Sequence, residues 1–263
     1  MTHLTEAIRR ARSDQREPLD SHDHPWAANL EGGDVSPRDH ADIRPFSERA
    51  VGPVPIASPV KRLQPRAQQQ LRGLIDRVFL PVSGETVRSV GLAAVGQGVK
   101  SGPITAALTE LLAQETHGRV CAIDANYARP SLHEQFGLRQ PVALGSELEG
   151  GPRELRHNVC VFSMVQTHLR PALATDPTGV RLARLIGSFD YVLFDLEPVG
   201  DDVLSNAVIR LVDGVILIID AAVTRPSIAQ PVVGVLRSAG VTILGAVLTN
   251  RRYPVPGSIY QRL

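Results

Sequence analysis

The stretch RSVGLAAVGQGVKSGPITAALTELLA, residues 88–113, decides the fold. An apolar segment over residues 87–95 predicts a strand, and the segment after it places Leu108, Leu111 and Leu112 on one face of a helix. The loop between strand and helix carries two glycines, a lysine and a serine, namely Gly96, Gly98, Lys100 and Ser101. In nucleotide-binding proteins the amides of such a loop, the helix N-terminus and the lysine hold the phosphates. The order of elements therefore predicts a phosphate-binding loop.

The loop nevertheless departs from the pattern G-x-x-x-x-G-K-[ST] that defines such loops. With Lys100 and Ser101 on the last two positions, Ala94 and Val99 stand where the two glycines belong. A β-branched valine disfavours a positive φ angle and crowds the place where the backbone should approach a phosphate. We therefore expect the loop to be weakened or inactive as a triphosphate site.

Length and composition set the remaining bounds. The chain has 263 residues, 43% of them hydrophobic, which suffices for one sizeable core. Its net charge of +1 gives no electrostatic case for nucleic acid as a partner. Cys121 and Cys160 lie in apolar segments and are expected to be buried thiols in a reducing compartment. No segment is apolar enough to span a membrane and no signal peptide is evident, so we expect a cytoplasmic protein.

The chain is predicted to have three regions. One face of a helix predicted over residues 1–16 carries the apolar side chains of Leu4, Ala7, Ile8 and Ala11. This helix fits either a docking element or a frayed terminus. Residues 17–66 are rich in proline and lack apolar periodicity, so they are predicted to form a flexible linker. The folded domain is predicted to span residues 67–263.

Strands and helices alternate along this predicted domain. A helix is expected over residues 71–79, before the first strand. Further strands are expected at 119–123, 159–165, 191–194, 215–219 and 241–248, and further helices at 178–186, 203–211 and 228–238. This alternation predicts an α/β fold with a mostly parallel sheet flanked by helices on both faces. Ligands of such sheets bind at the carboxyl ends of the strands.

Two aspartates stand at predicted strand ends. Asp124 closes the segment VCAID, and Asp195 closes the segment YVLFD. A carboxylate in this position beside a phosphate loop is where Mg²⁺, or a water bound to it, is held. A single aspartate of this kind often marks only the end of a strand. Two of them after a phosphate-type loop point to a site, so Asp124 and Asp195 are the candidate metal ligands and catalytic residues.

The segment DANYARPSLHEQFGL, residues 124–138, resembles the second nucleotide motif of the bacterial tyrosine kinases (BY-kinases) of capsule and exopolysaccharide biosynthesis, I-D-A-D/N-x-R-x-P-S-L-H-x-x-F-G. Further similarities are FDYVLFD at 189–195, DGVILII at 213–219, the pair Thr224-Arg225, LGAVL at 244–248 with the tail RYPVP, and the opening MTHLTEAIRRA. The resemblance covers residues 67–263. It implies a P-loop NTPase fold related to MinD and ParA, with ATP and Mg²⁺ as ligands.

The resemblance also implies a place in the cell and a partner. Family members control polysaccharide polymerisation or export through a membrane-anchored copolymerase, or chain-length regulator, at the inner membrane. Their C-terminal tyrosine cluster is autophosphorylated, and here Tyr253 and Tyr260 are the candidate phosphoacceptors. The family's subunit-contact pattern E-x-x-R-x-x-R appears as Gln69-x-x-Arg72-x-x-Ile75 and lacks two of its three charges. A homo-oligomer is therefore left open.

The residues implied for the nucleotide are Gly96, Gly98, Lys100, Ser101, Thr249 and Asn250. Here too the chain departs from the family. An ungapped comparison places Ser101 on the lysine of the first nucleotide motif, Walker A, and Gly102 on its Ser/Thr. Thr249 stands where the family has an adenine-contacting asparagine, which follows one place later as Asn250. Glu197 adds a carboxylate after the strand of Asp195.

Three hypotheses follow. In the first, the chain is a pseudokinase with a degenerate Walker A loop, which serves as a binding module for a polysaccharide-export complex. In the second, it is an active tyrosine autokinase in which Lys100 still reaches the phosphates and Asp124 and Asp195 hold Mg²⁺. In the third, it is a MinD-like ATPase switch that phosphorylates nothing. The departures in the loop favour the first.

Overall fold

The computed structural model describes residues 57–81, 87–96, 98–127, 129–141, 153–156, 158–164, 187–199, 208–209 and 212–251. All of them belong to one compact unit, Pro37–Leu263. The helix predicted over residues 1–16 and most of the predicted linker, residues 17–56, lie outside this described part. Within it, no helix has the length and apolar character needed to cross a membrane.

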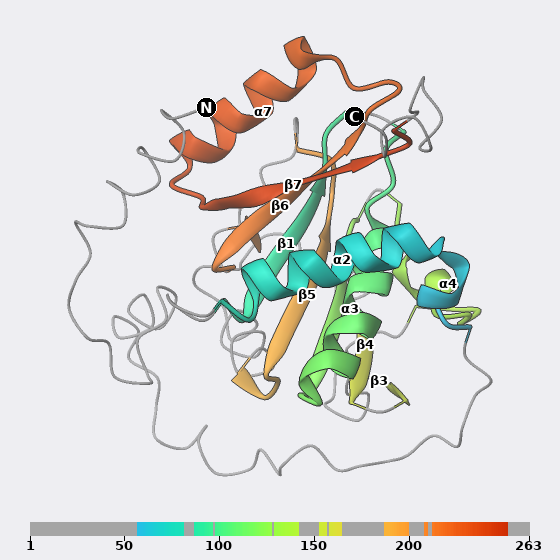
Figure 1. Cartoon of the computed structure of the whole chain (residues 1–263). Helices are drawn as coiled ribbons and strands as arrows, with labels where there is room; N and C mark the ends of the chain where they lie inside the picture. Colours follow the sequence, from blue (N-terminus) through green and yellow to red (C-terminus); the bar gives the residue numbers. More distant parts are fainter. Residues whose placement is uncertain are drawn as a thin grey trace, which may run out of the picture. The chain divides into compact units, whose positions relative to one another are not determined.

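A seven-stranded sheet lies at the centre of the unit, with the strand order β3-β4-β2-β5-β1-β6-β7 (Figure 1). Its strands are β1 (Ser89–Ala94), β2 (Val120–Ala125), β3 (Arg153–Arg156), β4 (Val159–Ser163), β5 (Tyr191–Leu196), β6 (Gly214–Asp220) and β7 (Ile243–Thr249). Every neighbouring pair is parallel except β3 and β4. The predicted α/β fold with a mostly parallel sheet is confirmed, whereas the antiparallel edge strand β3 was not predicted.

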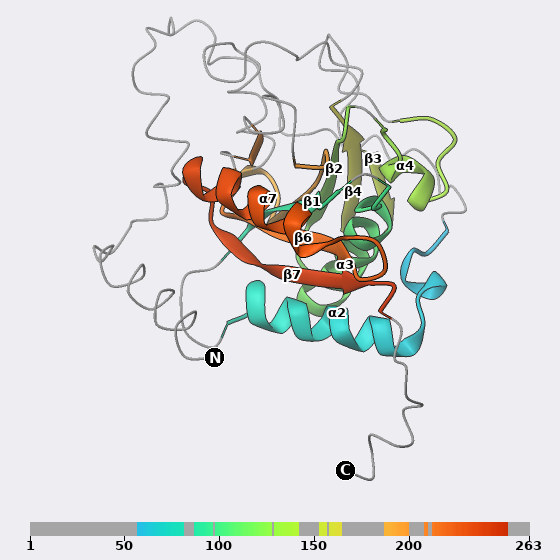
Figure 2. The ribbon, with the colours of Figure 1, turned by 90° about the horizontal axis from the view of Figure 1, so that it is seen from above.

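Helices cover both faces of this sheet. The helical elements are η3 (Val60–Arg62), α2 (Pro65–Val78), α3 (Gly102–Thr116), α4 (Leu132–Gln135) and α7 (Pro226–Ser238). Figure 2 shows α2 and α3 on one side of the sheet and α7 on the other. Accordingly, the apolar side chains of α2 and α3 belong to one buried cluster and those of α7 to a second. Of the helices predicted at 178–186 and 203–211, only residues 208–209 are described, and these two are helical.

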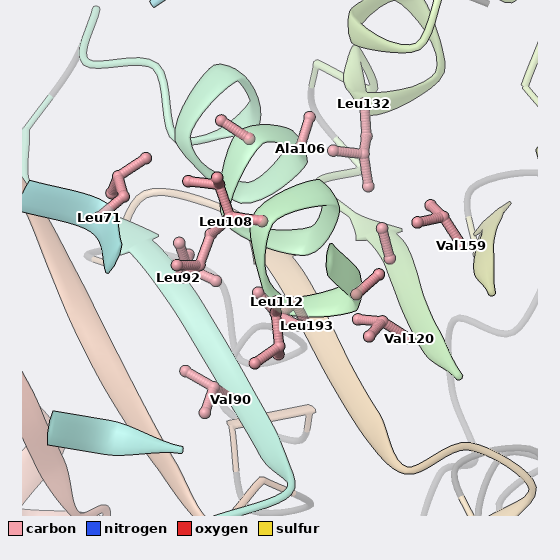
Figure 3. Close-up of a cluster of buried hydrophobic side chains, with 14 of the residues drawn as sticks. Leu71, Val90, Leu92, Ala106, Leu108, Leu112, Val120, Leu132, Val159 and Leu193 are labelled. Atoms are coloured by element: carbon pink, nitrogen blue, oxygen red, sulfur yellow. The ribbon is translucent and has the colours of Figure 1, made fainter. Parts of the chain in front are cut away.

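The core is densest where α3 crosses the central strands. Alternate residues of β1 point to opposite faces, so that Val90 and Leu92 join the cluster under α3 while Ala93 joins the other. Figure 3 shows Leu108 and Leu112 of α3 directed at the strands beneath them. Burial of each such leucine contributes about 1.5–3 kcal/mol. This packing fixes the N-terminus of α3 over the ends of β1 and β5.

The folded unit begins earlier than the sequence predicted. The hydroxyl of Ser58 donates to both carboxylate oxygens of Glu110 at 2.8 Å, and the N–H of Val60 donates to one of them at 3.1 Å. Val60 itself lies in the core. Residues 57–66, predicted as part of the linker, therefore belong to the fold. Pro65, the last proline of the predicted linker, lies in the first turn of α2, where a proline has no hydrogen bond to lose.

The two cysteines occupy paired positions on neighbouring strands. Cys121 of β2 lies beside Cys160 of β4, and both are buried free thiols, as the sequence predicted. Burial raises the pKa of Cys160 to about 12 and holds the pKa of Cys121 well above its ordinary value. The thiols are therefore protonated and unreactive in the folded chain.

Candidate functional site

The loop between β1 and α3 retains a backbone shape that suits an anion. Gly96 and Gly98 adopt positive φ angles of 92° and 83°, which glycine tolerates without strain. Within the described part of the chain, the amides of residues 98–102 donate no hydrogen bond to any protein group. Because they precede the first turn of α3, they combine free donors with the positive end of the helix dipole. This arrangement can hold a phosphate.

Two side chains limit what this loop can hold. Val99, directly before the lysine, is buried in the core cluster rather than leaving the space that a glycine would leave. Pro103 lies in the first turn of α3 and has no N–H to offer. The next two amides, of Ile104 and Thr105, already donate to the carbonyl of Ser101 at 2.9 Å. Free donors are therefore confined to the loop itself, and Lys100 is exposed beside them.

Asp124 lies at the end of β2 and is almost fully buried. Its carboxylate accepts hydrogen bonds from the amides of Leu132 at 2.9 Å and Asn126 at 3.2 Å, so it organises the turn that leads to α4. Burial nevertheless raises its pKa to about 6, and the backbone donors offset only part of that effect. Asp124 thus combines a structural role with a carboxylate that is costly to ionise in this position.

Asp195 is the counterpart of Asp124 on the neighbouring strand. The two residues are register partners in β2 and β5, and Asp195 is 1% exposed. Burial is the main cause that raises its pKa to about 7, and the charge of Asp124 raises it further. The hydroxyls of Ser101 and Thr105 lower that pKa, yet neither carboxylate oxygen has a hydrogen-bond partner of normal geometry. A buried carboxylate in this state requires a proton or a cation.

The start of α3 lies against this carboxylate. A Cβ atom added to Gly102 would lie 3.1 Å from Oδ2 of Asp195 and 3.2 Å from the hydroxyl of Ser131. The two alignments of the loop place either Ser101 or Gly102 on the Ser/Thr position of the Walker A motif, and both residues lie near Asp195. Ser101 brings a hydroxyl there, whereas Gly102 brings only its backbone. Of these two residues, Ser101 is the one whose side chain has an oxygen that could bind a metal ion.

The donor set fits Mg²⁺. Asp124, Asp195 and Ser101 offer hard oxygen ligands, and protein sites for Mg²⁺ commonly supply one or two carboxylates while waters and substrate phosphates complete the shell. The described residues contain no group of three or more His, Cys, Asp or Glu side chains that could hold a metal. The ion would therefore need phosphate oxygens or water in addition to these residues, as in phosphoryl-transfer sites.

Comparisons with known proteins bear on the fold that carries this site. No protein-family model matches the chain. The putative tyrosine-protein kinase CapB of Staphylococcus aureus is 21% identical over 201 residues, which are 73% of this chain and 88% of that protein. The crystal structure of the chimerical protein CapA2B2 matches 75% of this chain and 92% of its own at 17% identity, with a TM-score of 0.62. The kinase domain of Escherichia coli tyrosine kinase ETK matches 72% of this chain and 79% of its own at 18% identity, with a TM-score of 0.58.

The chain has the fold of a bacterial tyrosine-kinase domain. The same P-loop fold is found in the cell-division ATPase MinD. This confirms the resemblance that residues 124–138 carry. The paired carboxylates and the β1–α3 loop lie at the carboxyl ends of parallel strands, the edge of such a sheet at which ligands bind.

Thr249 and Asn250, the residues predicted for the base, lie at the end of β7, at the same edge of the sheet as the carboxylates and two strands away from β1. Thr249 donates its hydroxyl to the carbonyl of Ile219 at 3.3 Å. Asn250 donates its side-chain amide to Oδ2 of Asp220 at 2.7 Å, and this bond is the main cause that holds the pKa of Asp220 below its ordinary value. Both side chains are thus engaged with β6. Asp220 was not predicted as a residue of this region, although it ends the apolar segment VILIID in the same way as Asp124 and Asp195 end theirs.

The other residues that the sequence singled out have different outcomes. Tyr253 and Tyr260 lie outside the described residues. Two residues of the subunit-contact pattern are used within the chain: Ile75 is fully buried, and Arg72 forms an ion pair with Glu115 of α3, whereas Gln69 is exposed. Glu197 is buried beyond the end of β5. Thr224 was not predicted as a site residue, yet its hydroxyl donates to the carbonyl of Val95 at 3.1 Å and braces the start of the loop.

Proposed function

We propose that this chain is a tyrosine-kinase-like protein of capsule or exopolysaccharide biosynthesis that no longer transfers phosphate. It acts as a regulatory partner of a membrane-anchored polysaccharide copolymerase, and it reaches the inner membrane from the cytoplasm through that partner. The kinase-related role rests on the likeness to CapB and to the tyrosine-kinase domains. The loss of phosphotransfer rests on the β1–α3 loop.

The observation that carries the proposal is the buried side chain of Val99. In a competent loop the residue before the lysine is a glycine whose backbone wraps the phosphates. A valine that packs into the core ties the loop to the protein interior at that point. Phosphoryl transfer depends on donors positioned around the β- and γ-phosphates, so a loop that is tied to the interior and cannot close around them loses the main source of catalysis. Pro103 deprives the first turn of α3 of one more donor.

Glu197 adds an electrostatic argument in the same direction. It is buried two residues after Asp195, so a third carboxylate follows the strand end that would face the triphosphate. A triphosphate carries several negative charges, and each additional carboxylate nearby raises the free energy of its bound state. About 1.4 kcal/mol corresponds to a tenfold loss in affinity. From the loop and this carboxylate together, the proposal predicts weak or absent nucleotide binding.

One observation favours a second candidate, an ATP-dependent autokinase or ATPase switch. Asp195 has two buried oxygens without hydrogen-bond partners, and Ser101 lies beside it. Mg²⁺ would satisfy those oxygens, and the free amides of residues 98–102 would meet a phosphate. In that case Lys100 would contact the phosphates, while Asp124 and Asp195 would hold the ion or its water.

A MgATP titration of the purified full-length chain, followed by a phosphotyrosine blot, tests the proposal. The wild type is expected to bind MgATP more weakly than about 1 mM, which corresponds to a binding free energy of about −4 kcal/mol, and to show no phosphotyrosine. The variant Val99→Gly is expected to bind at least about tenfold more tightly, because it frees the loop. Val99→Ala is the matched control, since it removes side-chain volume without making positive φ angles accessible.

A micromolar affinity of the wild type that is lost in Lys100→Ala, Asp124→Ala and Asp195→Ala would overturn the proposal. Phosphotyrosine in that same wild-type sample would then identify an autokinase. Hydrolysis of ATP without phosphotyrosine would identify an ATPase switch.

A further inference from the structure

The start of α3 lacks a side chain at a point where phosphate-binding loops carry a hydroxyl. In the pattern G-x-x-x-x-G-K-[ST] the residue at the last position supplies its hydroxyl to Mg²⁺. The ungapped alignment puts Gly102, the first residue of α3, on that position. A Cβ atom at Gly102 would lie 3.1 Å from Oδ2 of Asp195, so position 102 faces a carboxylate that a metal ion would use. In this alignment the hydroxyl expected beside Asp195 is missing.

A hydroxyl from another part of the chain borders the same point. The Oγ atom of Ser131 would lie 3.2 Å from a Cβ atom at Gly102. Ser131 directly precedes α4, and Leu132, the next residue, belongs to the same buried cluster as the apolar residues of α3 (Figure 3). Oδ2 of Asp195 and Oγ of Ser131 therefore border one small space, which is open because residue 102 is a glycine.

The backbone of Ser131, rather than its hydroxyl, holds the residue in this place. The amides of Ser131 and Leu132 both donate to the carboxylate of Asp124. A serine in front of a helix commonly caps it through the hydroxyl, but Ser131 makes no such bond to α4. One candidate metal ligand, Asp124, thus fixes the position of Ser131, while the hydroxyl is not used as a helix cap.

The other candidate ligand, Asp195, lacks partners that a hydroxylated site would supply. Both of its carboxylate oxygens are buried, and neither has a hydrogen-bond partner of normal geometry. Among the described residues, no third His, Cys, Asp or Glu side chain joins Asp124 and Asp195 in a group that could hold a metal. A cation at this point would therefore need oxygens of another kind, and serine hydroxyls fill this role in phosphate-binding loops.

We propose that Ser131 supplies, from outside the phosphate loop, the hydroxyl oxygen that position 102 lacks, and that it helps to hold a divalent cation of the Mg²⁺ type at Asp124 and Asp195. The hydroxyl acts on the ion directly or through a bound water. The inference goes beyond the proposed function, because a cation can be held whether or not phosphate is transferred.

Titration of the full-length chain with Mn²⁺, in the absence of nucleotide, tests the role of Ser131. Mn²⁺ takes the same hard oxygen ligands as Mg²⁺, and electron paramagnetic resonance measures the unbound ion. At pH 8, where both carboxylates are ionised, the wild type is expected to bind Mn²⁺ that excess Mg²⁺ displaces, and Asp195→Asn should abolish this binding. Ser131→Ala should weaken the affinity about tenfold, whereas Ser131→Thr keeps the hydroxyl and should retain it.

Moving the hydroxyl from position 131 to position 102 separates this role from a purely structural one. Gly102→Ser in the Ser131→Ala background returns a hydroxyl to the same space and should restore the affinity to within about threefold of the wild type. Gly102→Ala in the same background is the matched control. Both variants bring a Cβ atom to the same distance from Asp195, so they differ only in the hydroxyl, and the alanine should restore nothing.

Any of four results would overturn the proposal. The wild type could bind no Mn²⁺. Asp195→Asn could leave the binding unchanged, which would place the ion elsewhere on the chain. Ser131→Ala could bind Mn²⁺ as tightly as the wild type. Gly102→Ser could restore no more affinity than Gly102→Ala, which would leave Ser131 a structural role alone. No nucleotide is present in these titrations, so none of the results depends on whether the chain transfers phosphate.

Discussion

Strands β1 and β7 have similar apolar sequences and very different surroundings. Every residue of β1 is buried, whereas no residue of β7 is. The cause is position: β1 has β5 and β6 as neighbours and helices over both faces, while among the described strands β7 has only β6 as a neighbour. An apolar run therefore predicts a strand, but the order of strands decides how much that strand contributes to stability.

The same contrast governs the aspartates at the strand ends. Asp195 on the central strand β5 has a raised pKa because it is buried. Asp220 on β6 has a lowered pKa because its carboxylate accepts hydrogen bonds from the side chain of Asn250 and the amide of Ala222. An aspartate at this end of the sheet is thus costly to ionise on the central strand β5 and easy to ionise on β6, which is next to the edge strand. Only the central pair has the electrostatic character of a metal or proton site.

The largest effect is expected from removing core volume. Leu193→Ala in β5 deletes a fully buried side chain and should lower the free energy of unfolding by about 3–4 kcal/mol. Leu248→Ala in β7 removes a side chain that is half exposed and should change it by less than about 0.5 kcal/mol. Urea unfolding of both variants and the wild type measures the difference. Equal losses would mean that β7 is as deeply packed as β5 in solution.

The second largest effect is expected in how the free energy of unfolding depends on pH. The folded-state pKa values of Asp195, about 7, and Asp124, about 6, lie above the ordinary value of 3.8. Between pH 4 and 7 the folded chain therefore binds more protons than the unfolded chain, and its stability falls as pH rises, by up to about 1.4 kcal/mol per pH unit for each group. Asp195→Asn should flatten this fall when unfolding is measured from pH 5 to 8.

Asp220→Asn is the control for that experiment. Its lowered pKa places its titration below pH 4, so this variant should keep the wild-type slope from pH 5 to 8. An equal change of the pH slope in both variants would contradict the contrast between Asp195 and Asp220, because Asp220 is not expected to titrate in this range.

Replacing a strand glycine by alanine should change the stability of the fold by a smaller amount, and the change should differ between β1 and β7. A Cβ atom on Gly91 of β1 would lie 2.5 Å from Cδ1 of Leu196, so Gly91→Ala should destabilise the fold by about 1–3 kcal/mol. A Cβ atom on Gly245 of β7 would meet nothing within 4 Å, so Gly245→Ala should be neutral or slightly stabilising. Thermal unfolding of the two variants compares them. Destabilisation by Gly245→Ala would indicate that something covers β7 at that residue.

The smallest effect is expected from helix glycines. Gly234→Ala in α7 meets no atom within 4 Å and should raise stability by about 0.5–1 kcal/mol through helix propensity. Gly73→Ala in α2 meets only the end of the Arg77 side chain, at 3.4 Å, and should give a similar gain. Chemical denaturation checks both. A gain from Gly73→Ala alone would show that α7 opens separately from the core.

Sequence reasoning identified what depends on local pattern. Residues 88–113 specified strand, loop and helix in the right order, and Asp124 and Asp195 were predicted as partners because both follow apolar strands. Their register pairing confirms that they lie side by side. Parallel βα units make such a prediction reliable, since successive strands bring their carboxyl ends to one edge.

What the sequence did not predict depends on contacts between distant residues. The bond from Ser58 to Glu110 joins positions 52 residues apart, and no periodicity in the proline-rich segment indicated it. The antiparallel strand β3 has four residues with three charges, so it lacks an apolar pattern. The bond between Asn250 and Asp220 depends on β6 and β7 being neighbours. In each case a tertiary contact, rather than local preference, determines the structure.

The paired cysteines provide a natural reporter of core opening. Cys121 and Cys160 lie on β2 and β4, two strands of the packed region that holds Asp124. A thiol reagent can modify them only when this region opens and the sulfur atoms ionise in water. The rate of labelling in the wild-type chain therefore measures how often the centre of the sheet opens, and it does not report motion of β7. No residue has to be replaced to read it.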